Sequence, residues 1–339
     1  MERVEIKREA LAKMAEEVLT GLNVPAADAA LTVAVLMDAE VSGVESHGLM
    51  RLKAYADRIA QGVIEARPEV KVEINGAVAR VDGGNGLGQV VMAKATDTAC
   101  ELAKKFGIGA VTVCHSNHFG TAAFYANRLA DAGCIGLAAS MAGPTMAPFG
   151  GMDLLLGTNP FAVAFPGAVQ TFCGDMATSA TAKGKIRIFE KKGLPLPPGW
   201  ALDAEGNETT DPAAAIKGIL LPMGGHKGYA LAMAVDAVSA LLSGACLSCE
   251  SASVFSQKAA NTGHFVVAVD IAHFLPLNEF KERAQEWFDK IRASRPRPGF
   301  SIMIPGEPEA KKRAAAGDTV SLLSETMAAV EEYHARYAK

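Results

Sequence analysis

The sequence has no long run of apolar residues. No stretch of its 339 residues approaches the roughly 20 consecutive apolar positions that a membrane-spanning helix needs. The chain opens with MERVEIKREALAKMAEE, which is charged from its second residue and does not contain the apolar segment of a secretory leader. We therefore expect a protein that stays in the cytoplasm and has no membrane partner.

Charge of one sign is not in excess either, because 33 lysines and arginines stand against 37 aspartates and glutamates, a formal net charge of −4. A chain without a strongly basic surface binds nucleic acid poorly, so we expect no nucleic-acid partner. The six cysteines are scattered without the close spacing of a disulfide framework, which favours free thiols in a reducing compartment. Cys246 and Cys249 form one isolated CxxC pair, to which we assign no role, and we expect no metal.

The length of the chain and its hydrophobic periodicity predict an α/β protein of two parts. Residues 1–68 are expected to be a helical N-terminal part, because apolar positions recur at helical spacing through residues 4–62. Alternation of apolar and polar residues on both sides of Asn75-Gly76 then predicts a β-hairpin, which opens an α/β domain over residues 69–275. The same patterns predict helices at 276–292 and 319–337 and a long surface loop at 191–212.

The segment DGGNGLGQ, residues 82–89, lies between a predicted strand and a predicted helix, as the dinucleotide fingerprint does. Its glycines at 83, 84, 86 and 88 cannot be fitted to the G-x-G-x-x-G register, in which each glycine has a steric role. The preceding strand also belongs to a hairpin rather than to a parallel βαβ unit. The segment therefore predicts a glycine-rich turn before a helix, and not a Rossmann domain.

A polar stripe runs through ESHGLMRLKAY, residues 45–55. Ser46 is a candidate helix N-cap, and His47, Arg51 and Tyr55 recur at intervals of four, which would place them on one helix face. An arginine fixed there can hold a carboxylate through two parallel hydrogen bonds, with the histidine close to the neighbouring atom of the ligand. The alternative is an ordinary solvated helix face.

Two histidines stand three residues apart in CHSNHFG, residues 114–120, between an apolar strand and a helical run. A strand-to-helix turn is where α/β proteins often bind ligands, and a neutral histidine is a common proton donor for the reduction of a carbonyl or imine. A metal site would need further ligands, and no cysteine or carboxylate stands in obvious register. Core histidines remain the second alternative.

Seven blocks run in order along nearly the whole chain: SHGLMRL (46–52), SNHFGTAAFYA (116–126), PFGG (148–151), GTNPFAVAFP (157–166), DMATS (175–179), LPMGGHKGYALA (221–232) and PGEPE (305–309). Together they resemble the malate/L-lactate dehydrogenase family of the second type, which includes ureidoglycolate and sulfolactate dehydrogenases and piperideine- and pyrroline-carboxylate reductases. The resemblance implies a non-Rossmann fold in which residues 69–275 form a largely antiparallel NAD(P)-binding domain. It also implies a helical domain built from both chain ends, residues 1–68 with helices of about 276–339, and a homodimer.

The resemblance further implies roles for individual residues. His118 becomes the proton donor and acceptor, a role that some members give to the histidine matching His47. Arg51 binds the substrate carboxylate, and Ser46 and Thr158 line the pocket. The matching cofactor contacts are Ser140, Asp175, Met176, Ala177, Lys227, Gly306, Glu307 and Pro308.

Two groups of cations are suited to a phosphorylated cofactor. Lys227 stands where glycines open a helix, so backbone N–H groups and the positive helix end can face a pyrophosphate. Lys183, Lys185 and Arg187 follow the DMATS block, and no carboxylate precedes Glu190 there to accept from bare ribose hydroxyls. We therefore expect NADP, without excluding NAD, unless this triplet is merely a solvated segment.

The expected function is the interconversion of a small 2-hydroxy acid, or a 2-amino or cyclic imino acid, with its 2-oxo or imine form by hydride transfer with NAD(P)H. The alternative is a non-catalytic binding or regulatory protein on the same scaffold.

Overall fold

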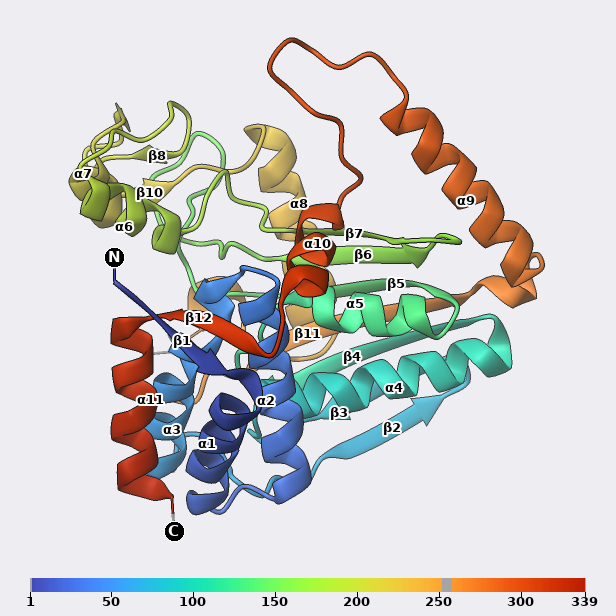
Figure 1. Cartoon of the computed structure of the whole chain (residues 1–339), viewed down its shortest axis with the longest axis horizontal. Coiled ribbons are helices and arrows are strands. Elements are labelled where there is room, and N and C mark those ends of the chain that lie inside the picture. The colour runs from blue at the N-terminus through green and yellow to red at the C-terminus, as the bar shows by residue number, and fades with distance from the viewer. Residues whose placement is uncertain (1, 252–257, 339) are drawn as a thin grey trace.

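The structure is a computed structural model that describes residues 2–251 and 258–338 (Figure 1). Its centre is a seven-stranded sheet, in which every neighbouring pair is antiparallel except β3 and β4. In spatial order the strands are β2 (Lys71–Asn75), β3 (Val78–Asp82), β4 (Ile108–Ser116), β11 (Thr262–Asp270), β5 (Cys134–Ser140), β6 (Phe161–Pro166) and β7 (Thr171–Met176). The hairpin at Asn75-Gly76 is confirmed, and so is the largely antiparallel, non-Rossmann sheet.

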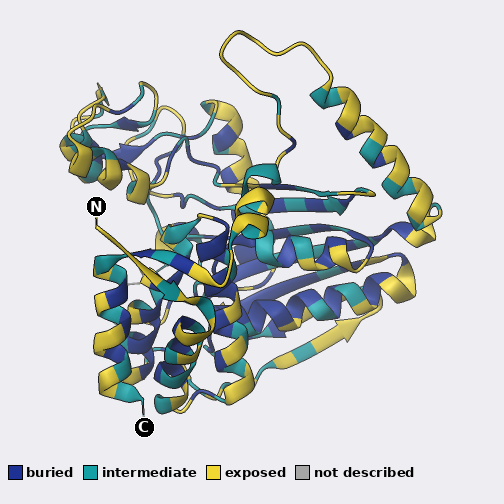
Figure 2. Cartoon of the chain, in the orientation of Figure 1, coloured by how far each residue is buried: buried dark blue, intermediate teal, exposed yellow. Residues whose placement is uncertain are grey.

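Two helices, α4 (Gly88–Phe106) and α5 (Ala122–Asp131), pack on the sheet and form its main core. The strands alternate as a half-buried sheet requires, so that Val111 and Val113 of β4 are fully buried. Alanines and glycines at the contact let the helices approach closely, and a Cβ on Gly109 would lie 2.2 Å from the carbonyl oxygen of Ala99. Figure 2 shows this region as the most continuously buried part of the chain.

Both chain ends form the helical part. Its elements are β1 (Arg3–Lys7), α1 (Arg8–Gly21), α2 (Ala26–Val41), α3 (Leu52–Ala60), β12 (Thr319–Leu323) and α11 (Ser324–Tyr337). Leu11, Leu36 and Leu52 pack into one core with Leu322 and Tyr333, which confirms a helical domain made from both ends. The predicted helix at 319–337 begins late, because alternation buries Val320 and Leu322 and pairs residues 319–323 with β1.

Helix α9 (Leu277–Arg292) departs from the expected packing with the N-terminal helices. Phe280 and Phe288 instead pack against Phe165 and Phe172 of β6 and β7, so aromatic burial holds α9 to the far edge of the sheet (Figure 1). Helix α10 (Glu307–Ala315), by contrast, lies against α2. The division of the chain at residues 68 and 69 stays a prediction.

A small satellite core lies beyond β7. It contains α6 (Lys183–Lys192), β8 (Ala201–Leu202), β9 (Glu208–Thr209), α7 (Pro212–Lys217), β10 (Ile219–Leu220) and α8 (His226–Asp236), which continues into the π-turn η3 (Ala237–Leu241). The predicted surface loop at 191–212 therefore contains two short strands of a three-stranded sheet. Short 3₁₀ turns also occur at η4 (Ser248–Glu250) and η5 (Ile271–His273). Within residues 2–251 and 258–338, no helix is long and apolar enough to cross a membrane.

Candidate active site

His118 lies in the turn between β4 and α5, and the glycine-rich segment supports this turn. The Asn117 side chain donates hydrogen bonds to the carbonyl oxygens of Asn85 (3.3 Å) and Gly86 (2.9 Å). A Cβ on Gly88 would lie 2.1 Å from the Asn117 carbonyl oxygen and 2.5 Å from that of His118, so only glycine lets α4 begin here. The segment at 82–89 thus packs against the histidine turn, which explains its glycines without a dinucleotide.

The stripe from His47 to Tyr55 is not one helix face, and Ser46 is not an N-cap. Two 3₁₀ turns, η1 (Glu45–His47) and η2 (Leu49–Arg51), are separated by the extended residue Gly48. Tertiary packing nevertheless brings the stripe to His118. The His47 ring stacks on the His118 ring with centroids 5.4 Å apart, and the Tyr55 hydroxyl lies 2.6 Å from His118 Nδ1.

Ser46 orients both His47 and Arg51. Its hydroxyl lies 2.9 Å from His47 Nδ1, and its carbonyl oxygen accepts a hydrogen bond of 2.7 Å from Arg51 Nε. The arginine plane is therefore fixed within one turn of the stacked histidines. A fixed guanidinium is suited to hold a carboxylate. The imidazoles beside it are suited to exchange a proton with the oxygen on the carbon next to that carboxylate.

Burial and the Arg51 charge keep both histidines neutral. Burial, and then Arg51, lower the pKa of His47 to about 4. The same two causes, followed by His47 and His264, hold the pKa of His118 well below its usual value. Burial raises the pKa of Tyr55 to about 12, so its hydroxyl keeps its proton. The resting site thus places the cation of Arg51 beside uncharged proton carriers.

Glu40 of α2 supports the turn that carries His47, and the sequence alone did not identify it. Its side chain is buried, and Oε2 accepts a hydrogen bond of 3.0 Å from the Leu49 N–H. Burial raises the pKa of Glu40 to about 7. A Cβ on Gly48 would lie 2.0 Å from the same Oε2, which is why glycine occupies the junction between the two turns.

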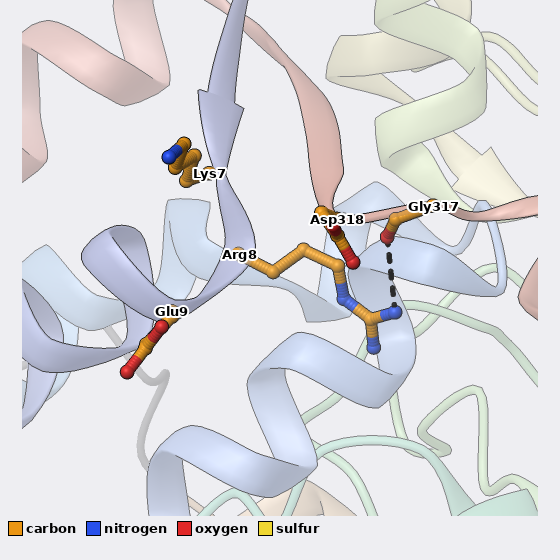
Figure 3. A pocket seen from close by; sticks show the side chains of 5 residues that line it. All are labelled: Lys7, Arg8, Glu9, Gly317 and Asp318. Atoms are coloured by element: carbon orange, nitrogen blue, oxygen red, sulfur yellow. Dashed lines mark hydrogen bonds between the residues drawn. The ribbon is translucent and has the colours of Figure 1, made fainter.

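Gly48→Ala is expected to lower kcat/KM by about tenfold, because the new methyl group displaces the Glu40 carboxylate from Leu49 and shifts His47. Gly317→Ala is the matched control, since no heavy atom lies within 4 Å of its Cβ position. Gly317 lines a cavity of about 430 Å³ with Arg8 and Asp318 (Figure 3), which contains none of the predicted site residues. Steady-state kinetics of the two variants measure the effect. Equal kcat/KM values in Gly48→Ala and Gly317→Ala would contradict the proposal that Glu40 supports the turn of His47.

His264 is a second residue that the sequence did not single out. It is fully buried on β11, and its Nδ1 and Nε2 lie 2.9 Å from the hydroxyls of Ser140 and Ser116 respectively. Its ring stacks on Phe119 at 4.7 Å, next to His118. Burial lowers the pKa of His264 to about 3, so it stays neutral and links the predicted cofactor residue Ser140 to the histidine turn. Only the pairing of β11 with β4 and β5 brings these residues together.

Several of the residues expected to contact the cofactor lie along β7 or just after it. The Thr158 carbonyl oxygen accepts from the Thr178 N–H at 2.8 Å, which places Thr158 beside the segment that follows Asp175, Met176 and Ala177. Met223 N donates to the Thr178 carbonyl oxygen at 2.9 Å, so the turn before α8 lies there too. The Cβ position of Gly306 is 3.0 Å from the Cys173 backbone, which places residues 306–308 against β7.

Two carboxylates of this group already have structural partners. Asp175 accepts from the Ala123 N–H at the start of α5 (2.9 Å), and burial raises the pKa of Asp175 to about 6 although part of the residue remains exposed. Glu307 pairs with Lys311 at 2.7 Å and Arg292 at 3.2 Å, and its bond from Lys311 is the main cause that lowers the pKa of Glu307 to about 2. Any contact from residues 306–308 to a cofactor would therefore come from the backbone.

The cations Lys183, Lys185 and Arg187 lie on a helix, α6. Lys183 and Arg187 are one turn apart, and burial followed by the charge of Arg187 lowers the pKa of Lys183. Lys185 points elsewhere, since its Nζ lies 5.0 Å from the centre of the Trp200 ring. Two of the three cations thus share a face.

Lys227 is exposed in the first turn of α8. Gly224 and Gly225 precede this helix with φ of +60° and +65°, and no heavy atom lies within 4 Å of the Gly224 Cβ position. The Gly228 N–H already donates to the Met223 carbonyl oxygen, whereas His226 and Lys227 at the helix start are exposed. This arrangement fits an anionic group such as a pyrophosphate.

Comparisons with known proteins identify the family. The chain is 41% identical over 314 residues to malate dehydrogenase of Pyrococcus horikoshii, covering 90% of this chain and 87% of that protein. It is 40% identical over 264 residues to (2R)-3-sulfolactate dehydrogenase (NADP(+)) of Chromohalobacter salexigens, covering 77% and 79%, and 31% identical over 330 residues to ureidoglycolate dehydrogenase (NAD(+)) of Escherichia coli, covering 95% and 93%.

The solved structure of sulfolactate dehydrogenase from Methanocaldococcus jannaschii superposes with a TM-score of 0.95 at 36% identity, covering 98% of this chain and 97% of that one. These relatives are all dehydrogenases, which favours catalysis over the non-catalytic alternative. The model of the family described as malate/L-lactate dehydrogenase matches residues 6–330. The chain is therefore an oxidoreductase that belongs to the malate/L-lactate dehydrogenase family.

Proposed function

We propose that the protein interconverts a small 2-oxo acid and the corresponding 2-hydroxy acid with a nicotinamide cofactor. One observation carries the proposal: His118 is stacked on His47 and bonded to Tyr55, next to the fixed guanidinium of Arg51. The arrangement provides a carboxylate-binding cation close enough to a proton carrier to lower its pKa. The names of the relatives, which include malate, sulfolactate and ureidoglycolate dehydrogenases, support this substrate class.

The proton passes through His118. Nδ1–H can donate to the Tyr55 hydroxyl oxygen both in the protonated ring and in the neutral ring that is left when Nε2 has given up its proton, so the tyrosine holds the ring in both states. This leaves Nε2 to exchange a proton with the substrate oxygen. The nicotinamide ring supplies or accepts the hydride, and the protein's part is to hold the acid and move the proton.

The substrate itself adjusts the histidine. In the free site the Arg51 charge is one cause of the low pKa of His118. A substrate carboxylate bound to Arg51 neutralises that charge and so raises the pKa of His118 towards its usual range. Binding of the acid therefore prepares the proton donor that its reduction requires.

This coupling predicts different pH profiles for kcat and kcat/KM in the reduction. Reduction needs protonated His118, so both quantities fall as pH rises through its pKa. The profile of kcat, which reports the bound complex, should show the higher pKa, and that of kcat/KM the lower one. Rates between pH 5 and 9, with Arg51→Gln as a comparison that raises the free-enzyme pKa, measure the difference. Coincident pKa values in the parent would contradict the coupling.

The substrate class is tested by a panel. NADPH or NADH oxidation is followed by absorbance with 2-oxo acids, matched aldehydes that lack the carboxylate, and cyclic imino acids, which the same clamp could hold. We expect turnover only with compounds that carry a carboxylate next to the reacting carbon. Turnover of the aldehydes at equal kcat/KM would remove the carboxylate clamp, and no turnover of any compound would remove the proposed substrate class.

For the cofactor we propose NADP. The support is the pair Lys183 and Arg187 on one face of α6, because two cations favour a 2′-phosphate over a bare ribose hydroxyl. The relatives include both an NADP(+) and an NAD(+) enzyme. Gly224, Gly225 and Lys227 would hold the pyrophosphate at the start of α8.

Lys183→Ala should lower the ratio of kcat/KM for NADPH over NADH by about tenfold, the loss of one charge-assisted hydrogen bond. Lys185→Ala is the control, since its ammonium lies over Trp200 and its removal should leave the ratio unchanged. Both ratios are measured at one fixed salt concentration. A parent ratio below one, or equal ratios in the parent and Lys183→Ala, would contradict NADP preference. The homodimer and the cytoplasmic location also stay proposals, the first testable by light scattering.

A further inference from the structure

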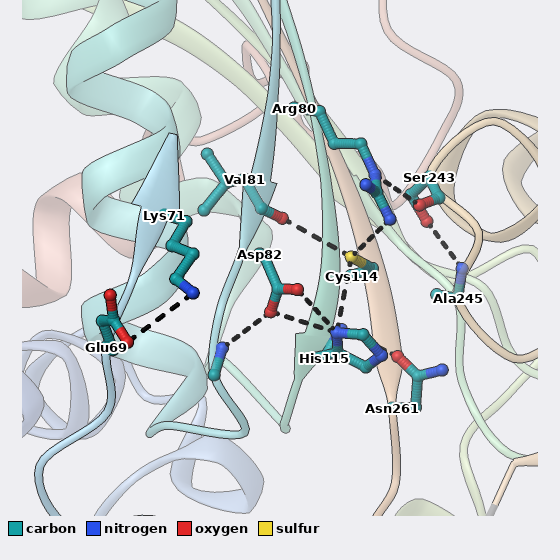
Figure 4. Close-up of polar contacts among 11 residues, drawn as sticks. Glu69, Lys71, Arg80, Val81, Asp82, Cys114, His115, Ser243, Ala245 and Asn261 are labelled. Carbon is teal, nitrogen blue, oxygen red and sulfur yellow. Dashed lines mark hydrogen bonds and ion pairs between the residues drawn. The ribbon is translucent and has the colours of Figure 1, made fainter. Parts of the chain in front are cut away.

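A second cluster of reactive side chains lies at the ends of β3 and β4, beside the candidate active site and separate from its chemistry (Figure 4). It consists of Asp82, Cys114 and His115, whose carboxylate oxygen, sulfur and ring nitrogen all lie within 4.8 Å of one another. Parallel pairing of the two strands places Asp82 in register with Cys114. Because Asp82 is 33 positions before His115, the spacing in the sequence predicted no metal there.

The backbone at His115 brings the cluster together. Neighbouring residues of a regular strand point to opposite sides, but His115 has a φ of +48°, and its N–H donates to Asn261 Oδ1 at 2.7 Å. Its Nδ1 consequently lies 3.0 Å from both carboxylate oxygens of Asp82 and 3.8 Å from Cys114 Sγ. A left-handed conformation at a non-glycine residue is uncommon and is found mostly where the surrounding structure requires it.

These separations fit one small divalent cation. Zinc binds sulfur at about 2.3 Å and imidazole nitrogen at about 2.0 Å, so tetrahedral ligand atoms are about 3.3 to 3.7 Å apart. The two separations from His115 Nδ1, 3.0 and 3.8 Å, lie on either side of that range, whereas the carboxylate oxygen and the sulfur, within 4.8 Å of each other, would have to close around the ion. A thiolate, an imidazole and a carboxylate together favour zinc over magnesium or calcium, which prefer oxygen ligands alone.

The surroundings accept the charge of such an ion. Burial raises the pKa of the Cys114 thiol and Arg80 lowers it, and Arg80 Nη2 donates to Cys114 Sγ at 3.3 Å, so the guanidinium would stabilise the thiolate that forms when a metal displaces the proton. A thiolate and a carboxylate balance the two charges of the ion, and Arg80 remains as the single excess cation. A cavity of about 210 Å³, lined by Gly84, Asn261 and His115 among others, adjoins the cluster and has room for water as a fourth ligand.

We propose that Asp82, Cys114 and His115 form a binding site for a zinc-like divalent cation. The ion joins the end of β3 to the end of β4, which leads directly into the turn of His118. The turn after Asp82 already bonds to this segment, because Gly83 N donates to the Cys114 carbonyl oxygen and Asn85 N to that of His115. Bound metal therefore stabilises the base of the candidate active site without entering it, and the inference does not depend on the proposed reaction.

The test uses the full chain, kept reduced and stripped of metal with a chelator. Titration with Co²⁺, a spectroscopic substitute for zinc, should give a thiolate-to-cobalt absorption band that saturates at one ion per chain, and Zn²⁺ should displace it. Zn²⁺ should also raise the Tm in a concentration-dependent way. An absence of the band and of any shift in Tm at a hundredfold excess of metal would overturn the proposal.

Variants assign the ligands. Cys114→Ser should abolish the thiolate band. His115→Gln should weaken Co²⁺ binding by about tenfold or more, because loss of even a residue that only hydrogen-bonds to a metal ligand lowers metal affinity by about that factor. Cys246→Ser/Cys249→Ser is the control, because this pair holds the other thiols at close spacing in the sequence. Circular dichroism verifies that each variant is folded. If substitution of the buried Cys114 prevents folding, His115→Gln still tests the site, because it changes an exposed side chain. Loss of the band in the double control, with retention in Cys114→Ser, would move the metal to the CxxC pair and refute the site.

Discussion

His118→Ala should lower the rate of 2-oxo acid reduction by about a hundredfold or more, the usual contribution of general acid catalysis. The substitution removes the group that we propose to exchange a proton with the substrate oxygen, and whose ring the Tyr55 hydroxyl holds. Cofactor affinity should change little, because the residues proposed to bind the dinucleotide lie around the end of β7 and the start of α8. Steady-state rates together with fluorescence titration of the reduced cofactor separate the two effects.

Two further histidine variants make the test decisive. His47→Ala should raise KM more than it lowers kcat, since His47 stacks on His118 and is held by Ser46. His273→Ala, on η5 and bonded to Asp270, should leave both constants unchanged. Near-normal kcat in His118→Ala combined with lost turnover in His47→Ala would reverse the two roles.

Arg51→Lys should raise the KM for the 2-oxo acid by about tenfold or more while leaving the net charge of the chain unchanged. A lysine keeps the positive charge but loses the planar fork that binds a carboxylate through two parallel hydrogen bonds. It also loses the bond from Nε to the Ser46 carbonyl oxygen, which orients the guanidinium. Initial rates over a range of substrate concentrations give the effect.

The same variant separates charge from geometry. Because Arg51→Lys retains a cation near the histidines, the low pKa of His118 in the free enzyme should persist, whereas Arg51→Gln should raise it. Equal KM values in Arg51→Lys and the parent would show that a point charge is enough and would remove the bidentate clamp.

Local patterns in the sequence were sufficient for much of the fold. The alternation around Asn75-Gly76 specifies a hairpin because strand periodicity and turn chemistry agree there. The mismatch of the glycines at 83–88 with the dinucleotide fingerprint correctly excluded a Rossmann domain. At residues 319–323 the same reasoning was wrong, because pairing with residues 3–7 at the other chain end outweighed continuity with the following helix. Local propensity is a weak guide where a distant partner supplies the hydrogen bonds.

The candidate active site also shows that local sequence patterns do not reveal contacts between distant residues. Seven ordered blocks were enough to identify the family and to nominate His47, Arg51 and His118, because each block is contiguous in the chain. Glu40 and His264 have no motif of their own. Glu40 acts through the N–H of Leu49 across a helix junction, and His264 through two serines that sheet pairing brings to β11.

Residue types and their order along the chain therefore decided the oxidoreductase family, the non-Rossmann sheet and the candidate proton carriers. The tertiary structure alone decided that His47 reaches His118 although the helix face expected from His47 to Tyr55 is broken at Gly48. It also decided that Asp82 meets Cys114 and His115. The physical reason is that ring stacking, buried hydrogen bonds and ligand clusters depend on distances of a few ångströms between atoms. Strand register, helix packing and positive φ angles set those distances, and they join residues that no spacing in the sequence relates.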